Sequence, residues 1–454
     1  MAIVSIKSQQ VTFYDAEGWI LRAPVSTGTK GRETPAGVFA VLQKNIDHRS
    51  NLYDDAHMPH MQRITWNGIA MHGGPLPGYA ASHGCVRMPY GFASALFDKT
   101  RIGMRVIISP EDSAPVEFSH AALLVPNAEA VAAAPQRAET LARDAAEAAK
   151  AIDETKKAAK LAAREDASAK ASLRKLERLK SSADKDLADA EKAIASAKTD
   201  EAKARAEERK AKAAAKAPEV SAKLDAARAD AASKADAAAK AAEAAKEAAT
   251  RKTETAKAAD DAKLALVPVS VYISRATQKL YVRRNTGKAW PDGGEVFDAT
   301  IEVPVTIRDP DMPIGTHIFT AMAPGDAGLQ WTAVTIDSGD EAKNALDRIS
   351  IPQEVLDRIA PTALPRSSII VSDEPLSRET NYRTEFVAVL SNQPQGGFKT
   401  RRPTPSVSPW GAFPASGNTW QPGFFNFWDQ PSQKPQPRNK ARRGPSNPGK
   451  PFFW

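Results

Sequence analysis

A cysteine and two histidines lie in one short, glycine-rich segment, and these residue types together can perform nucleophilic chemistry. Cys85, the single cysteine of the chain, follows His83 by two positions and His72 by thirteen. A thiol is an effective nucleophile as the thiolate, and a neighbouring imidazole or cation favours that form. Glycines at 73, 74, 78 and 84 would let the segment adopt positive φ and bring backbone N–H groups near a bound carbonyl. The pattern predicts cysteine-dependent acyl transfer.

Each of these residues also has a structural explanation. A single cysteine is usually a small buried apolar side chain, and a single histidine is usually a hydrogen-bonded polar residue. Their grouping within one glycine-rich segment favours the catalytic interpretation. His57 and His60 have a spacing that could hold a metal on a helix, but Pro59 between them indicates a loop. We therefore expect no metal site.

The elements that must position this segment are β-rich, and we assign them to a domain at residues 1–125. Residues 11–14 and 19–21 flank a turn that ends in Gly18. Residues 63–66 and 69–71 flank Asn67-Gly68, a strong hairpin pair. A short helix is expected within residues 89–99.

Residues 126–266 have a different composition and predict a helical or coiled-coil spacer. Within 201–250, 24 of 50 residues are alanine, and charged residues fill most of the remainder. Alanine has the lowest cost in a helix, whereas a seam of alanine buries little area, so a strongly registered coiled coil is not expected. We predict a long helix or helical hairpin that breaks or kinks at Pro218.

Residues 267–390 predict a second β-rich domain that resembles a degenerate repeat of the first. Pro24-Val25 followed by Thr34-Pro35-Ala36-Gly37 has a counterpart in Pro304-Val305 followed by Met312-Pro313-Ile314-Gly315. The second copy has no cysteine, and its one histidine is His317. It cannot perform the cysteine chemistry predicted for the first.

Residues 391–454 predict a disordered, proline-rich basic tail. They hold twelve prolines, and their nine Lys or Arg and one Asp account for the net charge of +8 of the whole chain. The tail could bind an anionic polymer through the run Arg438 to Arg443, whereas a nucleic-acid surface over the whole molecule is not expected. No transmembrane segment and no secretion signal are visible in the sequence.

The segment Ser82-His83-Gly84-Cys85-Val86-Arg87, preceded by His72-Gly73, resembles the signature of the L,D-transpeptidase catalytic domain, the YkuD-type fold. Thr34-Pro35-Ala36-Gly37-Val38-Phe39 is similar to a strand entry of that family. The resemblance covers about residues 2–110. It implies a periplasmic or cell-envelope location and no cofactor.

The resemblance implies a role for each residue of the segment. Cys85 would be the nucleophile and His72 its base, with the Gly73 carbonyl orienting the imidazole. The N–H groups of Gly84 and Cys85 would stabilise the oxyanion, and His83 would shape the loop around the thiolate.

Four further residues would contact the substrate or its surroundings. Ser82 would shape the loop with His83, and Arg87 would either fix it or meet a substrate carboxylate. Trp66 and Tyr79 could line the donor groove, although a tryptophan in a hairpin strand is more often part of the core.

The reaction implied is acyl transfer from a peptidoglycan tetrapeptide stem with release of D-alanine. The acceptor would be an amine of a second stem, giving a 3→3 cross-link, or an amine of an outer-membrane protein or lipoprotein. Two alternatives remain: a non-catalytic scaffold that binds peptidoglycan, and an L,D-carboxypeptidase or amidase that uses water as acceptor.

Overall fold

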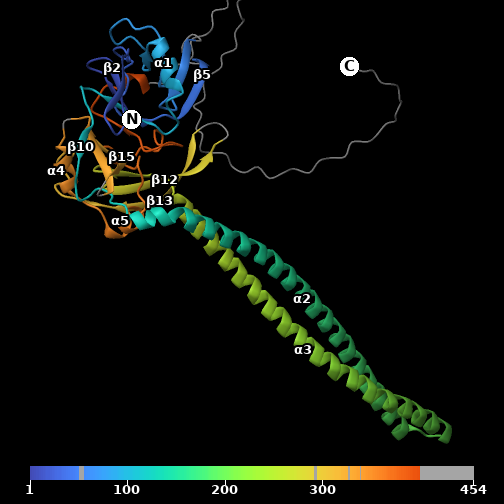
Figure 1. The fold of residues 1–454 in the computed structure, drawn as a ribbon. Helices are drawn as coiled ribbons and strands as arrows, with labels where there is room; N and C mark the ends of the chain where they lie inside the picture. The colour runs from blue at the N-terminus through green and yellow to red at the C-terminus, as the bar shows by residue number, and fades with distance from the viewer. Residues whose placement is uncertain (51–55, 291–293, 326–327, 338, 399–454) are drawn as a thin grey trace, which may run out of the picture. The chain divides into compact units, whose positions relative to one another are not determined.

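The computed structural model describes residues 1–50, 56–290, 294–325, 328–337 and 339–398. As predicted, a β-rich region, a long helical region and a further β-rich region follow one another along the chain (Figure 1). The tail from residue 399 onward, including the basic run at 438–443, lies outside the described residues.

The first β region contains ten strands and one helix among the described residues. They are β1 (Ala2–Ser5), β2 (Gln10–Tyr14), β3 (Trp19–Pro24), β4 (Gly37–Ala40), β5 (Gln43–Arg49), β6 (His57–Arg63), β7 (Ala70–Gly73), β8 (Val86–Met88), α1 (Tyr90–Phe97), β9 (Arg105–Ser109) and β10 (Val116–Phe118). Both predicted hairpins and the predicted helix occur, with six residues rather than two between β6 and β7.

All of these strands except β10 lie in two sheets. One sheet includes β19 (Ala388–Val389) from later in the chain and has the order β19-β4-β9-β1-β2-β3, and the other has the order β5-β6-β7-β8. Strand β1 is buried along its whole length because both of its faces are covered. Val4 packs with Met71 of the four-stranded sheet, whereas Ile3 packs with Tyr272 and Ile370 of the second β region. One face of the six-stranded sheet therefore packs against the four-stranded sheet, and its other face packs against the second β region.

The helical region is a hairpin of α2 (Ala128–Ser196) and α3 (Asp200–Leu264), which lie side by side (Figure 1). The predicted break at Pro218 is wrong, because α3 continues through that residue. The chain turns at residues 197–199 instead. There the Thr199 side chain accepts a hydrogen bond from the N–H of Ala202 and caps α3. The buried seam residues are mostly alanine, as the composition predicted.

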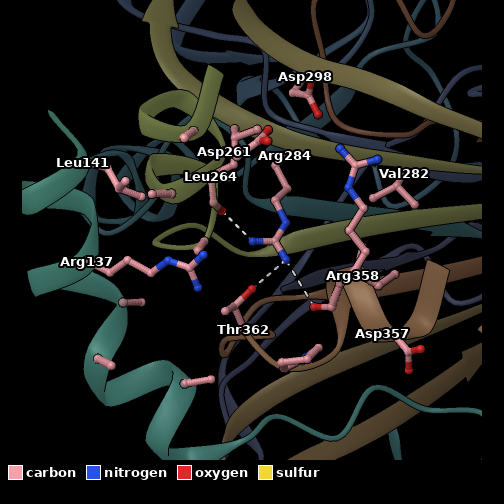
Figure 2. Close-up of a pocket in the computed structure, with 18 of the residues that line it drawn as sticks. Arg137, Leu141, Asp261, Leu264, Val282, Arg284, Asp298, Asp357, Arg358 and Thr362 are labelled. Atoms are coloured by element: carbon pink, nitrogen blue, oxygen red, sulfur yellow. Dashed lines mark hydrogen bonds between the residues drawn. The ribbon is translucent and has the colours of Figure 1, made fainter. Parts of the chain in front are cut away.

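Hydrogen bonds of the Arg284 side chain link the end of this hairpin to the second β region. Its guanidinium donates to the carbonyl of Leu264 at 2.5 Å, to the carbonyl of Ile359 at 3.1 Å and to Oγ1 of Thr362 at 3.0 Å (Figure 2). Burial lowers its pKa to about 10, so it stays charged at neutral pH. A cavity of about 970 Å³ lies beside it, lined by the ends of both long helices. Arg284 of β12 thus links the last residue of α3 to α5 and the loop that follows it.

The second β region carries the remaining elements. They are β11 (Val269–Ser274), β12 (Lys279–Ala289), β13 (Glu295–Pro304), β14 (Thr306–Ile307), β15 (His317–Gly325), β16 (Gly328–Thr335), α4 (Ala342–Asp347), β17 (Ile349–Ser350), α5 (Gln353–Ile359), β18 (Ser368–Ser372), β19 (Ala388–Val389) and the 3₁₀ turn η1 (Gly396–Phe398). The main sheet has the order β10-β16-β15-β18-β11-β12-β13.

The two β regions exchange strands. Strand β10 of the first region pairs with β16 of the second, and β19 of the second region pairs with β4 of the first. The buried Arg105 also crosses between them, donating to the carbonyl of Phe386 at 2.6 Å and to Oγ of Ser368 at 2.9 Å. The regions are thus joined by backbone pairing, a buried charge and a shared apolar core.

The predicted start of the disordered tail at residue 391 is wrong for residues 391–398, which contact both β regions. Ser391 donates its N–H to the Glu374 carboxylate at 2.7 Å. Phe398 packs against the core of the first region. An aromatic anchor and two glycines that permit close approach explain why this part of a proline-rich segment is ordered.

Within the described ranges, no helix has an apolar stretch that is long enough to cross a bilayer.

Candidate active site

Strands β7 and β8 bring the predicted residues to one face of the four-stranded sheet. The two strands are parallel, and His72 lies opposite Arg87. Because side chains alternate along a strand, His72, Arg87 and Cys85 (the residue just before β8) share a face. The intervening Met71 and Val86 point the other way, into the core. The thirteen-residue spacing thus places both reactive side chains on neighbouring strands.

These side chains line a pocket of about 260 Å³. Its lining combines residues of β5 to β8 and their loops with one glycine from the far end of the chain: His48, Ser50, Ala56, His57, Met58, Arg63, Asn67, Gly68, Ile69, His72, Pro75, Ser82, His83, Cys85, Arg87 and Gly397. His72, Ser82, His83, Cys85 and Arg87 of the predicted set are therefore together.

His72 is buried and held in one orientation. Its Nδ1 lies 2.9 Å from the carbonyl oxygen of Gly73. A carbonyl can only accept, so Nδ1 carries the proton and Nε2 is left as the basic nitrogen. Burial lowers the pKa of His72 to about 4, and the positive charge of Arg87 acts in the same direction. The imidazole is therefore neutral near pH 7 and able to accept a proton.

Cys85 is a protonated thiol in this environment. Burial raises the pKa of the thiol, while the Ala70 N–H and the cations of Arg87 and Arg63 oppose that rise. Its Sγ lies 3.7 Å from the carbonyl oxygen of Gly68, a weak hydrogen bond. The resting pair is thus a neutral thiol with a neutral imidazole.

The loop that carries Cys85 (residues 82–85, the Cys85 loop) is fixed by its own hydrogen bonds. Ser82 Oγ donates to the carbonyl of Cys85 and accepts the N–H of Gly84 at 3.1 Å. Thr34 Oγ1 donates to the carbonyl of Gly84 at 2.8 Å. Gly84 has φ of 120°, a conformation that favours glycine. In this state the Gly84 N–H, which the resemblance assigns to the oxyanion, is engaged by Ser82.

Two residues of the predicted set lie elsewhere. Trp66 and Tyr79 do not line the pocket. Trp66 donates its indole N–H to the carbonyl of Tyr382 at 2.6 Å, and the Tyr79 side chain is 65% exposed. Gly73 contributes its carbonyl to His72, and its own Cα lies against Tyr90 and Pro59, where a Cβ would be crowded.

The sequence analysis missed several pocket residues. His48, Met58 and Arg63 come from the β5–β6 hairpin and were not marked by any motif. The run of polar residues along β5 was a signal for an exposed hairpin. Gly397 carried no signal in the sequence.

His57 and His60 are not in the loop that Pro59 indicated. Both lie on β6 rather than on a helix or loop, and His57 pairs with Asp47 at 2.8 Å. No group of three or more potential metal ligands occurs within the part of the chain that the structure describes.

Comparison with known proteins identifies the first β region. Residues 1–108 match the family model of the L,D-transpeptidase catalytic domain, YkuD, in agreement with the resemblance predicted over residues 2–110. No curated protein matches the chain.

Solved structures of L,D-transpeptidases are similar over the same part of the chain. One from Mycobacterium smegmatis has 21% identity and a TM-score of 0.23, covering 24% of this chain and 57% of that one. One from Xylanimonas cellulosilytica has 27% identity and a TM-score of 0.22, covering 24% and 58%. The catalytic domain from an Enterococcus faecium L,D-transpeptidase has 24% identity and a TM-score of 0.21, covering 24% and 94%. The chain thus spans little more than half the length of the first two.

Proposed function

We propose that this protein, whose residues 1–108 match the L,D-transpeptidase catalytic domain, is a cysteine-dependent L,D-transpeptidase acting on peptidoglycan stem peptides. The observation that carries the proposal is the placement of Cys85, an oriented neutral His72 and Arg87 in one pocket. We infer action at the cell envelope, because that is where this substrate is found.

The first half-reaction forms a thioester. His72 Nε2 takes the thiol proton as Cys85 Sγ attacks the carbonyl of the third stem residue. The tetrahedral oxyanion is stabilised by the N–H of Cys85 and, if Ser82 releases it, by that of Gly84. The bond to the terminal D-alanine then breaks, and the proton held by His72 passes to its amine. The Gly73 carbonyl stabilises the imidazolium that exists between these two proton transfers.

The second half-reaction resolves the thioester. An amine attacks the acyl carbon, His72 removes its proton, and the sulfur leaves as a thiol that recovers that proton. Arg63 and Arg87 give the pocket two cations, which suit the carboxylates of a stem peptide. Water in place of the amine would make the enzyme a carboxypeptidase.

The other parts of the chain receive supporting roles in this proposal. Residues 126–266 act as a spacer and residues 267–390 as a non-catalytic β domain. The tail beyond residue 398, with its basic run at 438–443, binds an anionic wall polymer. The peptidoglycan stem supplies the acyl donor, and a second stem or a lipoprotein or outer-membrane protein supplies the amine.

The test is acylation by a carbapenem followed by intact-mass spectrometry. We expect one adduct at Cys85 in the wild type, none in Cys85→Ala, and a rate at least about 100-fold lower in His72→Ala. Gly91→Ala is a matched control, because a Cβ at this position of α1 meets no atom within 4 Å. A wild type that never gains the adduct overturns the proposal.

A second assay identifies the acceptor. Purified enzyme is given a tetrapeptide stem with and without a second stem that has a free side-chain amine. We expect a cross-linked product together with D-alanine. Release of D-alanine with the free tripeptide as the only other product would assign the hydrolytic alternative.

A further inference from the structure

A segment far from the catalytic motif forms part of the wall of the Cys85 pocket. Gly397 lines that pocket, and it belongs to the 3₁₀ turn Gly396–Phe398 beyond the second β region. The chain reaches this place through β19, in which Ala388 pairs with Val38 and Val389 pairs with Gly37. We call residues 396–398 the wall segment.

Hydrogen bonds anchor the wall segment to the loops around the site. The N–H of Gly397 donates to the Glu33 carbonyl at 2.8 Å, and the N–H of Gly396 donates to the Glu33 carboxylate at 3.1 Å. Asn67 donates its side-chain N–H to the carbonyl of Phe398 at 3.3 Å. The segment is therefore tied to Glu33 and to Asn67, which itself lines the pocket, and Phe398 fixes its end in the core.

Backbone packs directly on backbone at the Cys85 loop. A Cβ at Gly397 would lie 2.5 Å from the Glu33 carbonyl oxygen and 3.2 Å from the Cα of Gly84. A Cβ at Gly396 would lie 2.2 Å from the Glu33 carboxylate and 2.5 Å from the carbonyl carbon of Gly31. The two glycines thus allow a contact that no other residue permits without displacing the neighbouring backbone.

We propose that the wall segment is a positioning element of the active site, which holds the Cys85 loop in its reactive geometry and closes one side of the acyl pocket. The catalytic unit is then residues 1–109 together with 386–398, and the second β region delivers one of its parts. The expected change in carbapenem acylation rests on the proposed function, whereas the expected change in iodoacetamide alkylation does not.

The consequence for chemistry follows from the position of Gly84. A shift of the Cys85 loop moves the nucleophile and the N–H groups beside it, and a misplacement of about 1 Å can slow an acyl transfer by roughly 100-fold. Alkylation of the thiol by iodoacetamide is different, because the sulfur displaces iodide and no oxyanion forms. Opening the wall should therefore slow acylation and speed alkylation.

The experiment compares Gly397→Val with Gly91→Val in the full chain. Each adds the same atoms, but only at Gly397 do they meet neighbouring backbone. We expect Gly397→Val to slow carbapenem acylation at least about tenfold and to raise the rate of iodoacetamide alkylation at least about threefold. Phe398→Ala, which keeps both glycines, should shift both rates in the same two directions by less.

Three results would count against the inference or separate it from the proposed function. Equal acylation and alkylation rates in Gly397→Val and Gly91→Val overturn it. Rates that fall in proportion to the folded fraction, measured by circular dichroism, also overturn it, because they indicate loss of fold alone. A wild type that is alkylated but never acylated refutes the proposed function. The alkylation rate of Gly397→Val relative to Gly91→Val then tests the role of the wall segment by itself.

Discussion

The two β regions share a framework and differ in what is inserted into it. In the first, β1 pairs antiparallel with β2 and parallel with β9, which pairs antiparallel with β4. In the second, β11 pairs antiparallel with β12 and parallel with β18, which pairs antiparallel with β15. This shared order is what the predicted internal repeat requires.

One turn is reproduced in detail. The residues that correspond are Ser5 and Ser274, Ser8 and Thr277, Gln9 and Gln278, Val25 and Val305. Gln9 and Gln278 both have φ of 50°, and the side-chain amide of each donates to the carbonyl three residues earlier. The carbonyl of each glutamine accepts the N–H of its corresponding valine. The two turns therefore match in residue type, backbone conformation and hydrogen bonding.

The difference lies between β4 and β9, where the first region carries the four-stranded sheet and the Cys85 loop. Between β15 and β18 the second region carries β16, β17, α4 and α5. His317 of the second region is fully buried, and its ring nitrogens lie 2.9 Å from Thr335 Oγ1 and 2.9 Å from the carbonyl of Ile314. The shared framework therefore carries a cysteine beside a histidine only in the first region, where the segment between β4 and β9 contributes both residues.

The largest effect should separate the two histidines. We expect His72→Gln to slow carbapenem acylation by about 10²- to 10⁴-fold, because the base is lost. His317→Gln should leave the acylation rate of the folded protein unchanged and lower its stability by about 1–3 kcal/mol, because buried partners lose a hydrogen bond. Acylation rates and urea unfolding of both variants measure this. A slow His317→Gln enzyme at full stability would break the comparison.

A somewhat smaller effect should follow when the buried charge between the regions is removed. Arg105→Met leaves Glu385 and the Phe386 carbonyl without their partner and should cost about 3–5 kcal/mol of unfolding free energy. Lys7→Met removes one member of the exposed Lys7–Glu111 pair and should change the denaturation midpoint very little. Equal denaturation midpoints for the two variants would show that Arg105 does not join the regions.

The next effect is a pH dependence of stability. The pKa of His72 falls from 6.5 in the unfolded chain to about 4 in the fold, so the unfolded chain binds a proton first as pH falls. The wild type should lose about 3 kcal/mol relative to His72→Gln between pH 6.5 and pH 4. Burial lowers the pKa of His317 as well, which predicts a loss of the same sign in the second region. Urea unfolding at several pH values tests both predictions. A difference in unfolding free energy between the wild type and His72→Gln that stays constant with pH would refute the lowered pKa of His72.

The smallest effect concerns the repeated turn. Glycine at position 9 or 278 relieves the strain of φ 50° by roughly 1 kcal/mol. The Gln9 side chain also bonds to both the hydroxyl and the N–H of Thr27, bonds recorded for Gln9 and not for Gln278 within the described residues. We therefore expect Gln9→Gly to destabilise by about 1 kcal/mol and Gln278→Gly to be near neutral or stabilising. The reverse order in thermal unfolding would contradict this.

The core of the site was predictable because it is local. Thirteen residues separate His72 from Cys85, and two adjacent strands bring them together. The wall segment was not predictable, because Glu33 and Gly396 are 363 positions apart and their contact depends on the whole fold. Trp66 was placed in the donor groove on residue type alone, and its bond to Tyr382 could not be foreseen.

The fold was predictable to a similar degree. Hydrophobic alternation and turn residues identified the hairpins, and alanine content identified the helices. The exchanged strands were missed because β19 has only two residues and gains its structure from β4. The helix break was placed at Pro218, although Thr199-Asp200-Glu201, a capping threonine followed by acidic residues, was the better signal.

The pairing of β4 with β19 has a consequence for synthesis on the ribosome. Strand β4 receives its outer partner only after roughly 280 further residues have followed β9, which takes on the order of 15–60 s at usual translation rates. During that interval the nascent chain presents an unpaired strand edge, the kind of surface that recruits chaperones and promotes aggregation. Premature termination anywhere in the helical hairpin would leave every residue that lines the Cys85 pocket translated except Gly397 of the wall segment.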